Sequence, residues 1–222
     1  MSTAVSIRPA SGSSSLAKAV ALAIVLAVGV AFVAKYVFHY YLNYNPAGFA
    51  QYWSRRAMLL VHITSGMVAL LIGPFQFSRR LRQRNIQLHR VLGRTYLVAV
   101  LLGSLAGMGL AVTTTFGVIW GFSLFCLASA WITCGAMAFY AIWQRQVDVH
   151  REWMVRTYIV TFAFVSFRLL NDYGATSRLG NPGERADVYI WASWVVPMMV
   201  ASVIMQLRRM RRAAGPARVQ AR

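Results

Sequence analysis

The chain contains four histidines, and imidazole is a side chain that can ligate a metal or exchange a proton near neutral pH. The first two, His39 and His62, fall toward one face of the predicted bundle, and the last two, His89 and His150, fall toward the other. Two imidazoles at one depth on different helices can ligate a b-type heme when small residues leave room for its ring. The sequence therefore predicts heme-iron ligands at His62, His89 and His150, and only His62 falls clearly inside an apolar segment, where polar residues are functional candidates.

A His-Arg motif occurs twice, as HRVLGRTY at 89–96 and as HREWMVRTY at 150–158. An excess of arginine on one membrane face explains the presence of arginine but does not explain this repeated order. A shared anion or cofactor site would explain it, so Arg90 and Arg151 join the predicted site. The alternative is that both histidines are interfacial residues that cap helix starts or bind lipid phosphate.

Arg168 is the other charged residue inside a predicted span. It could anchor an anion, such as a heme propionate or a substrate carboxylate, or it could extend to the membrane surface. Asp172 follows one turn later and is expected to pair with it. At the opposite face, Asp148 and Glu152 flank the second His-Arg motif and are expected to pair with arginines of the first.

The span that carries His62 has a stripe of small and polar residues on one face. At about 100° per residue the stripe contains His62, Gly66, Ala69, Gly73 and Gln76. Small residues allow close approach of a neighbour, which is either another helix or a flat cofactor such as heme.

These residues are positioned by membrane-spanning helices. The chain of 222 residues is 58% hydrophobic and only 13% charged, and its apolar runs are near the roughly 20 residues that cross a bilayer. Backbone groups in lipid must be paired within a helix, so the spans are predicted to be helical. The predicted spans are 17–42, 57–78, 95–115, 118–143, 154–172 and 188–207. The net charge of +18 does not indicate nucleic acid as a partner, because the charges cluster at the ends of apolar segments.

The distribution of lysine and arginine predicts the orientation. Six arginines lie in 79–94, three in 145–156 and six in the tail that follows residue 207. This asymmetry predicts six spans with both termini cytoplasmic, and basic loops and a tail that lie near anionic lipid headgroups. The expected domains are a disordered arm at 1–16, a transmembrane domain at 17–207 and a basic cytoplasmic tail at 208–222. The offset of the two motifs predicts a four-helix core of two similar hairpins, with the first and sixth spans outside it.

Several pieces of the chain resemble a bacterial membrane-protein family known as domain of unknown function 2306. The matching pieces include His62-Ile63, Gly73-Pro74-Phe75-Gln76-Phe77, His89-Arg90, His150-Arg151-x-Trp153-Met154-x-Arg156 and Trp194 with Pro197. Met198 stands where the family pattern has asparagine. The resemblance implies a multi-pass protein of the bacterial cytoplasmic membrane and supplies no reaction.

The leading functional hypothesis is an electron-transfer protein that holds a b-type heme or a quinone at His62, His89, His150 and Arg168. The alternatives are a small permease gated by the 173–187 loop and a membrane scaffold without chemistry. No phosphate-binding loop, zinc-type spacing or intramembrane carboxylate pair supports a soluble-enzyme activity.

Overall fold

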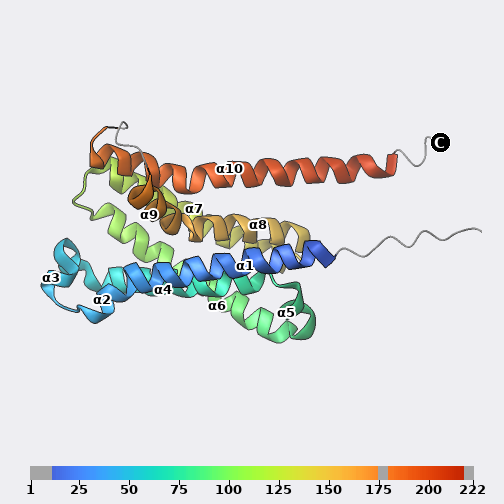
Figure 1. The fold of residues 1–222 in the computed structure, drawn as a ribbon, viewed down its shortest axis with the longest axis horizontal. Helices are drawn as coiled ribbons and strands as arrows, with labels where there is room; N and C mark the ends of the chain where they lie inside the picture. The colour runs from blue at the N-terminus through green and yellow to red at the C-terminus, as the bar shows by residue number, and fades with distance from the viewer. Residues whose placement is uncertain (1–11, 175–179, 218–222) are drawn as a thin grey trace, which may run out of the picture.

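The computed structural model describes residues 12–174 and 180–217, and this part of the chain is helical without strands. Six helical segments are long and apolar enough to cross a membrane, which confirms the predicted number (Figure 1). They are Ala19–Leu42, Pro46–Gln76, Ile86–Val112, Val118–Trp143, Val147–Tyr173 and Pro182–Ala213.

The first two spans meet in an aromatic cap. The first span contains α1 (Gly12–Phe32), a π-helical turn (Val33–Val37) and α2 (Phe38–Leu42); the second contains α3 (Pro46–Phe49), a 3₁₀ turn (Ala50–Arg55) and α4 (Arg56–Gln76). Asn45 caps α3 by accepting a hydrogen bond from the Gly48 amide. Phe49 is 1% exposed and packs edge to face with Tyr40, Tyr44 and Trp53.

Several helices begin earlier than apolar runs predict, because capping residues rather than hydropathy set their starts. The third span is a single helix, α6 (Ile86–Val112), and it begins nine residues before the predicted position 95. Asn85 caps it by accepting a hydrogen bond from the Leu88 amide at 2.8 Å. The preceding helix α5 (Arg79–Arg84) is capped in the same way by Ser78.

The sixth span is α10 (Pro182–Ala217), which starts with a reciprocal cap. The Glu184 amide donates to the Asn181 side chain at 3.0 Å, and the Asn181 amide donates to Glu184 Oε2 at 2.9 Å. The helix therefore starts before the predicted position 188. Part of the 173–187 loop, residues 175–179, lies outside the described residues.

The centre of the molecule is a four-helix core of α4, α6, α7 (Val118–Trp143) and α8 (Val147–Thr161). Each of the pairs α4–α6, α6–α7, α7–α8 and α4–α8 is in contact, so α6 and α8 lie diagonally opposite each other. The span of α1 packs on α4, and α10 packs mainly on α9 (Ala163–Tyr173), outside this core. The predicted arrangement of two hairpins with flanking first and sixth spans is confirmed.

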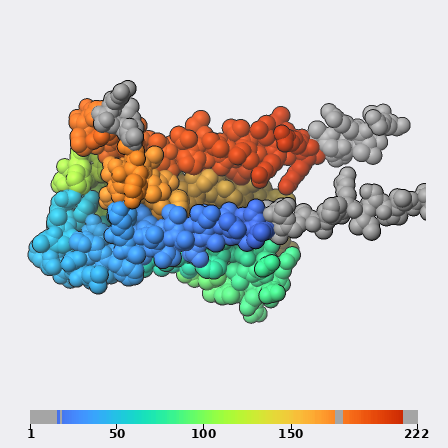
Figure 2. Space-filling model, in the orientation of Figure 1, coloured from blue at the N-terminus to red at the C-terminus, as the bar shows by residue number. Residues whose placement is uncertain are grey.

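The two ends of the bundle differ in charge. The start of α1, all of α5 and the end of α10 lie at one end, which we name the arginine-rich end after Arg79–Arg84 and Arg208–Arg212 (Figure 1). The aromatic cap around α3 lies at the opposite end, which we name the α3 end. In the space-filling view α10 runs along one side of the molecule, and α8 is visible between it and α1 (Figure 2). The predicted arm and tail overlap these helices, because α1 begins at Gly12 and α10 continues to Ala217.

Candidate functional site

His62 lies in the middle of the bundle and is held by its neighbours. Its Nδ1 is 2.8 Å from the carbonyl oxygen of Gly103, and because a carbonyl can only accept, Nδ1 donates. The ring lies edge-on to Trp131 and Phe164, at centroid distances of 6.5 and 6.3 Å. A Cβ atom added at Gly107 would lie 3.1 Å from the imidazole, so this glycine makes the room that the ring occupies.

His89 lies at the arginine-rich end of the core, one helical turn before Gly93, the residue of α6 that Gln76 of α4 approaches. Gln76 is 8% exposed, and its Oε1 is 3.3 Å from the position of a Cβ at Gly93, one turn beyond His89 on the same face of α6. Two buried nitrogens here, Gln76 Nε2 and His89 Nδ1, have no hydrogen-bond partner among the described residues. Buried polar groups are nearly always paired, so these two atoms define a site with unused hydrogen-bonding capacity.

His150 approaches the same end from α8. Its Nδ1 donates to the Ala138 carbonyl of α7 at 2.8 Å, which leaves Nε2 as the unprotonated nitrogen of the neutral ring. His89 and His150 lie near the starts of α6 and α8, at the same end of the bundle as Arg82 of α5 and Arg90. The arginine-rich end thus collects two of the three predicted histidines, together with Gln76.

The structure does not bring the third histidine to this cluster. His62 is hydrogen-bonded to the Gly103 carbonyl, and Gly103 lies about 21 Å along α6 from His89, so His62 is remote from the cluster. No group of three histidine, cysteine, aspartate or glutamate side chains able to hold one metal ion occurs within 12–174 and 180–217. At the α3 end, both nitrogens of His39 are engaged, one with Gly48 O at 3.3 Å and one with Asn43 Nδ2 at 3.1 Å. His39 therefore has no free nitrogen for an iron shared with His62.

The glycines that could have faced a porphyrin are covered by protein side chains. A Cβ at Gly73 would lie 2.1 Å from the Tyr158 ring, and a Cβ at Gly103 would lie 2.7 Å from Trp131. Gly93 is covered by Gln76 and Gly107 by His62, whereas Gly66 has no atom within 4 Å of its Cβ position. The small residues of α4 and α6 thus admit neighbouring helices, and the residues present do not fit a heme between the predicted ligands.

Arg168 lies at the α3 end, far along the bundle from His89. Its guanidinium carbon is 5.2 Å from the centroid of the Tyr36 ring, which is a cation–π contact. The expected partner, Asp172, does not pair with it: Asp172 accepts from the Tyr36 hydroxyl and from Lys35 Nζ at 3.5 Å. Lys35 and Tyr36 both belong to the π-helical turn Val33–Val37 of the first span. This turn lies beside α9, which carries Asp172.

The carboxylates of the second His-Arg motif also differ from the prediction. Asp148 pairs with Arg151 of its own helix at 3.0 Å, and both side chains are more than half exposed. Glu152 accepts two hydrogen bonds from Arg209 of α10 and lies 3.8 Å from Arg156. These carboxylates therefore do not clamp the two hairpins through Arg90 or its neighbours, because α10, which follows much later in the chain, covers that face of α8.

A hydroxyl-centred network, which the sequence pattern did not predict, joins α7 to the diagonally opposite helices α6 and α8. Thr161 Oγ1 donates to Thr157 O at 2.9 Å, and it lies 2.7 Å from Tyr96 OH and 2.9 Å from Trp131 Nε1. A hydroxyl has one proton and two lone pairs, so both ring groups must donate to Thr161. Tyr96 is 0% exposed and Trp131 is 6% exposed, so both donors of this network are buried in the core.

Fold and site together define a polytopic α-helical membrane protein with polar side chains gathered inside its core. The profile of the family described as "Predicted membrane protein (DUF2306)" matches residues 59–205, which is most of the chain. The chain belongs to this family, as the resemblance indicated. No curated protein and no solved structure matches the chain.

Proposed function

We propose that this protein binds a quinone at the arginine-rich end of its core, with the headgroup at Gln76, His89 and His150. The observation that carries the proposal is the pair of buried nitrogens, Gln76 Nε2 and His89 Nδ1, that have no acceptor among the described residues. An amide nitrogen can only donate, and leaving a buried donor unpaired costs about 1–3 kcal/mol. A ligand that supplies an acceptor at this position recovers that free energy.

A carbonyl oxygen suits both groups in the tautomer that carries the proton of His89 on Nδ1, because its two lone pairs can then accept from both nitrogens. A quinone presents such an oxygen on a ring that dissolves in lipid. Apolar side chains beside His89 on α6 are exposed, including Ile86, Leu88 and Val91, so an isoprenoid tail would remain in hydrocarbon. Arg90 beside His89 adds positive potential that favours an electronegative oxygen.

A quinone is preferred to a b-type heme, although both would serve electron transfer. A quinone needs hydrogen-bond donors at one level, whereas a heme needs two free imidazoles across an open space, and the side chains over Gly73, Gly93 and Gly103 leave no such space there. In this proposal His150 contributes an unprotonated Nε2 that can exchange a proton beside the ligand, and His62 serves helix packing. Arg151 and Arg168 have no part in holding the headgroup.

The test is a titration of the detergent-purified protein with decylubiquinone, followed by quenching of tryptophan fluorescence. We expect Gln76→Leu and His89→Phe each to weaken binding about tenfold, which corresponds to the loss of one buried hydrogen bond. Gln87→Leu is the matched control and should bind normally, because Gln87 is exposed on α6, the helix that carries His89. Organic extraction of the purified protein followed by mass spectrometry should recover the native quinone.

The stability of the ligand-free protein distinguishes a ligand-binding role of Gln76 from a purely structural one. Replacing an unpaired buried amide with leucine removes a desolvation cost, so the melting temperature without ligand should stay the same or rise. A fall in ligand-free stability together with unchanged decylubiquinone affinity would contradict the proposal. A Soret band that shifts on reduction would instead support a bound b-type heme.

We further propose that the arginine-rich end faces the cytoplasm of a bacterium and that the bilayer is its cytoplasmic membrane, in line with the excess of arginine there. A green fluorescent protein fused after the last residue should therefore fluoresce, and alkaline phosphatase fused there should be inactive. Both reporters placed in the segment between α2 and α3 should give the opposite results. Active phosphatase at the C-terminus would show that the protein has the opposite orientation in the membrane.

A further inference from the structure

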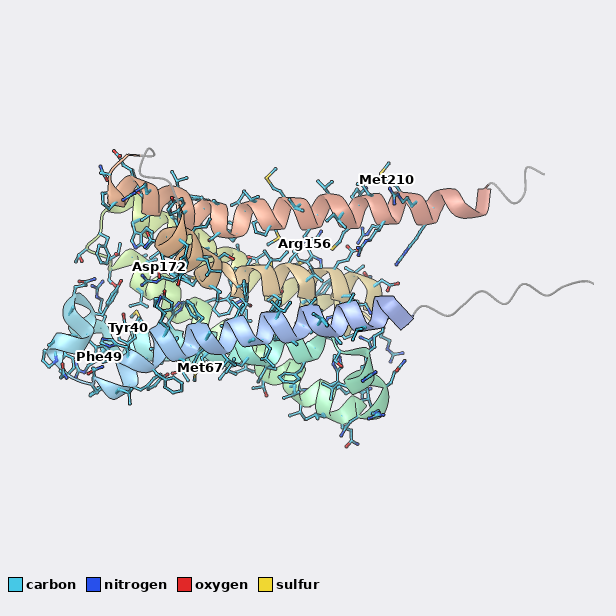
Figure 3. All side chains as sticks on the ribbon, viewed as in Figure 1. Tyr40, Phe49, Met67, Arg156, Asp172 and Met210 are labelled. Carbon is cyan, nitrogen blue, oxygen red and sulfur yellow. The ribbon has the colours of Figure 1, made fainter. Side chains whose placement is uncertain are left out.

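A groove separates the middle of α10 from α7 and α8, on the side of α8 away from the quinone site. Two cavities, of about 430 and 290 Å³, adjoin there, and Trp153, Arg156 and Ser202 line both of them. Their volumes lie at the scale of small-ligand sites. Figure 3 shows Arg156 between α8 and α10. The groove exists because α10 is buried only near its start: among its described side chains, those of Tyr189, Ile190 and Ser193 are buried, and every later one is at least partly exposed.

The groove is apolar at one end and charged at the other. The larger cavity continues along Ala130, Cys134 and Met198, near the middle of the bundle. The smaller one continues to Glu152 and Arg209 at the arginine-rich end. From Met198 to Arg209 the helix rises about 16 Å, which is close to half of the roughly 30 Å hydrocarbon core. The groove therefore has the length of one leaflet.

The charged end has one positive charge in excess. Glu152 is the acceptor for Arg209, through Nε at 2.7 Å and through Nη2, and it also lies near Arg156. The Arg156–Glu152 distance of 3.8 Å exceeds hydrogen-bond length, and Arg156 makes no hydrogen bond to a described residue. Its side chain is only 19% exposed and stacks on Trp153, with the guanidinium carbon 4.9 Å from the ring centroid. The side chain is thus largely buried and held against Trp153, while the guanidinium N–H groups donate to no described residue.

We propose that this groove holds one anionic phospholipid of the leaflet at the arginine-rich end. Its phosphate lies at Arg156 and Arg209, and one acyl chain runs past Ser202 to Met198. The excess positive charge selects an anionic headgroup, and the guanidinium fork of Arg156 matches phosphate geometry. A free phosphate would leave the apolar half of the groove uncovered, so the occupant must carry a chain.

Native mass spectrometry of the full chain in detergent tests this proposal, with phosphatidylglycerol, phosphatidylcholine and inorganic phosphate as the three probes. We expect saturable binding of one phosphatidylglycerol, about tenfold weaker binding of phosphatidylcholine, and no competition by millimolar inorganic phosphate. Arg156→Gln should weaken phosphatidylglycerol binding about tenfold, since a charge-assisted hydrogen bond is lost. Arg151→Gln is the matched control, because Arg151 is exposed on the same helix and does not line the groove.

Two further variants separate the lipid site from a structural role. Glu152→Gln removes the carboxylate that competes for Arg156 and Arg209, so it should strengthen phosphatidylglycerol binding, opposite to the effect of Arg156→Gln. Ser202→Trp fills the part of the groove that the two cavities share while keeping every charge, and it should abolish one-to-one binding. Melting temperatures without lipid show whether each variant is folded.

The proposal is overturned by any of three results. Equal loss of binding in Arg156→Gln and Arg151→Gln would mean general attraction to a basic surface. Unchanged binding in Ser202→Trp would mean that only a headgroup binds. Competition by inorganic phosphate would mean a phosphate site without a chain. None of these variants alters Gln76 or His89, so decylubiquinone affinity should stay the same throughout.

Discussion

Thr161→Val is expected to destabilise the protein by about 2–4 kcal/mol, because it leaves two buried donors without their acceptor. Tyr96 OH and Trp131 Nε1 both donate to this hydroxyl, and both rings are buried. Each orphaned buried donor costs about 1–3 kcal/mol, and hydrogen bonds between membrane helices fall toward the low end of such ranges. Thermal unfolding in detergent, followed by tryptophan fluorescence, measures the change.

The matched control for that variant is Thr157→Val, one turn earlier on the same helix. Thr157 is fully buried, but its hydroxyl donates to the Trp153 carbonyl of its own helix and accepts from no side chain of a described residue. Its loss should cost less than about 1 kcal/mol, because no donor is orphaned. Thr161→Ser should retain most of the stability. Equal destabilisation by the two valine variants would show that the network contributes nothing beyond packing.

Gly73→Ala is expected to cost about 1–3 kcal/mol by overpacking the contact between α4 and α8. The new methyl would lie 2.1 and 2.3 Å from two carbons of the Tyr158 ring. This ring cannot move freely, because its hydroxyl donates to Leu70 O at 3.1 Å and its centroid lies 5.6 and 6.2 Å from those of Phe77 and Phe162. The same unfolding measurement reports the loss.

Gly66→Ala on the same helix provides the opposite expectation. Apart from the backbone of its own helix, no atom of a described residue lies within 4 Å of a Cβ at Gly66, so alanine should be neutral or should stabilise the helix by up to about 1 kcal/mol. The cost of Gly73→Ala should largely disappear in a Tyr158→Ala background, since the two residues are in contact. Additive effects in that double variant would contradict the steric explanation.

Much of the fold could be predicted because a bilayer imposes simple rules on a chain. Apolar runs long enough to cross the hydrocarbon identified six spans, and the repeated His-Arg motif predicted two hairpins in a four-helix core, both of which the structure has. The predicted helix starts were less accurate. Asn85 and Asn181 cap α6 and α10 within polar sequence, so these helices begin before their apolar runs, and a capping side chain cannot be recognised from hydropathy.

The candidate site was predictable only in part. Depth follows from position along a span, so His89 and His150 were placed at one end and His62 away from it. The angular position of a residue on its helix also follows from sequence, which put Gln76 and Gly73 on one face of α4. What lies opposite that face does not follow, because it depends on which helix becomes the neighbour and how the two are rotated.

The amino-acid sequence by itself thus determined the membrane environment, the six helices, their alternating direction and the gathering of arginine at one end, since each depends on composition along a single helix. Only the tertiary structure decided that Tyr158 occupies the notch at Gly73, that Glu152 pairs with Arg209, that Asp172 pairs with Lys35, and that Gln76 lies against Gly93. Each of these contacts joins residues on different helices. Lipid solvates every apolar helix face alike, so hydrophobicity does not select among faces, and the choice comes from close packing and from the few polar groups that need partners.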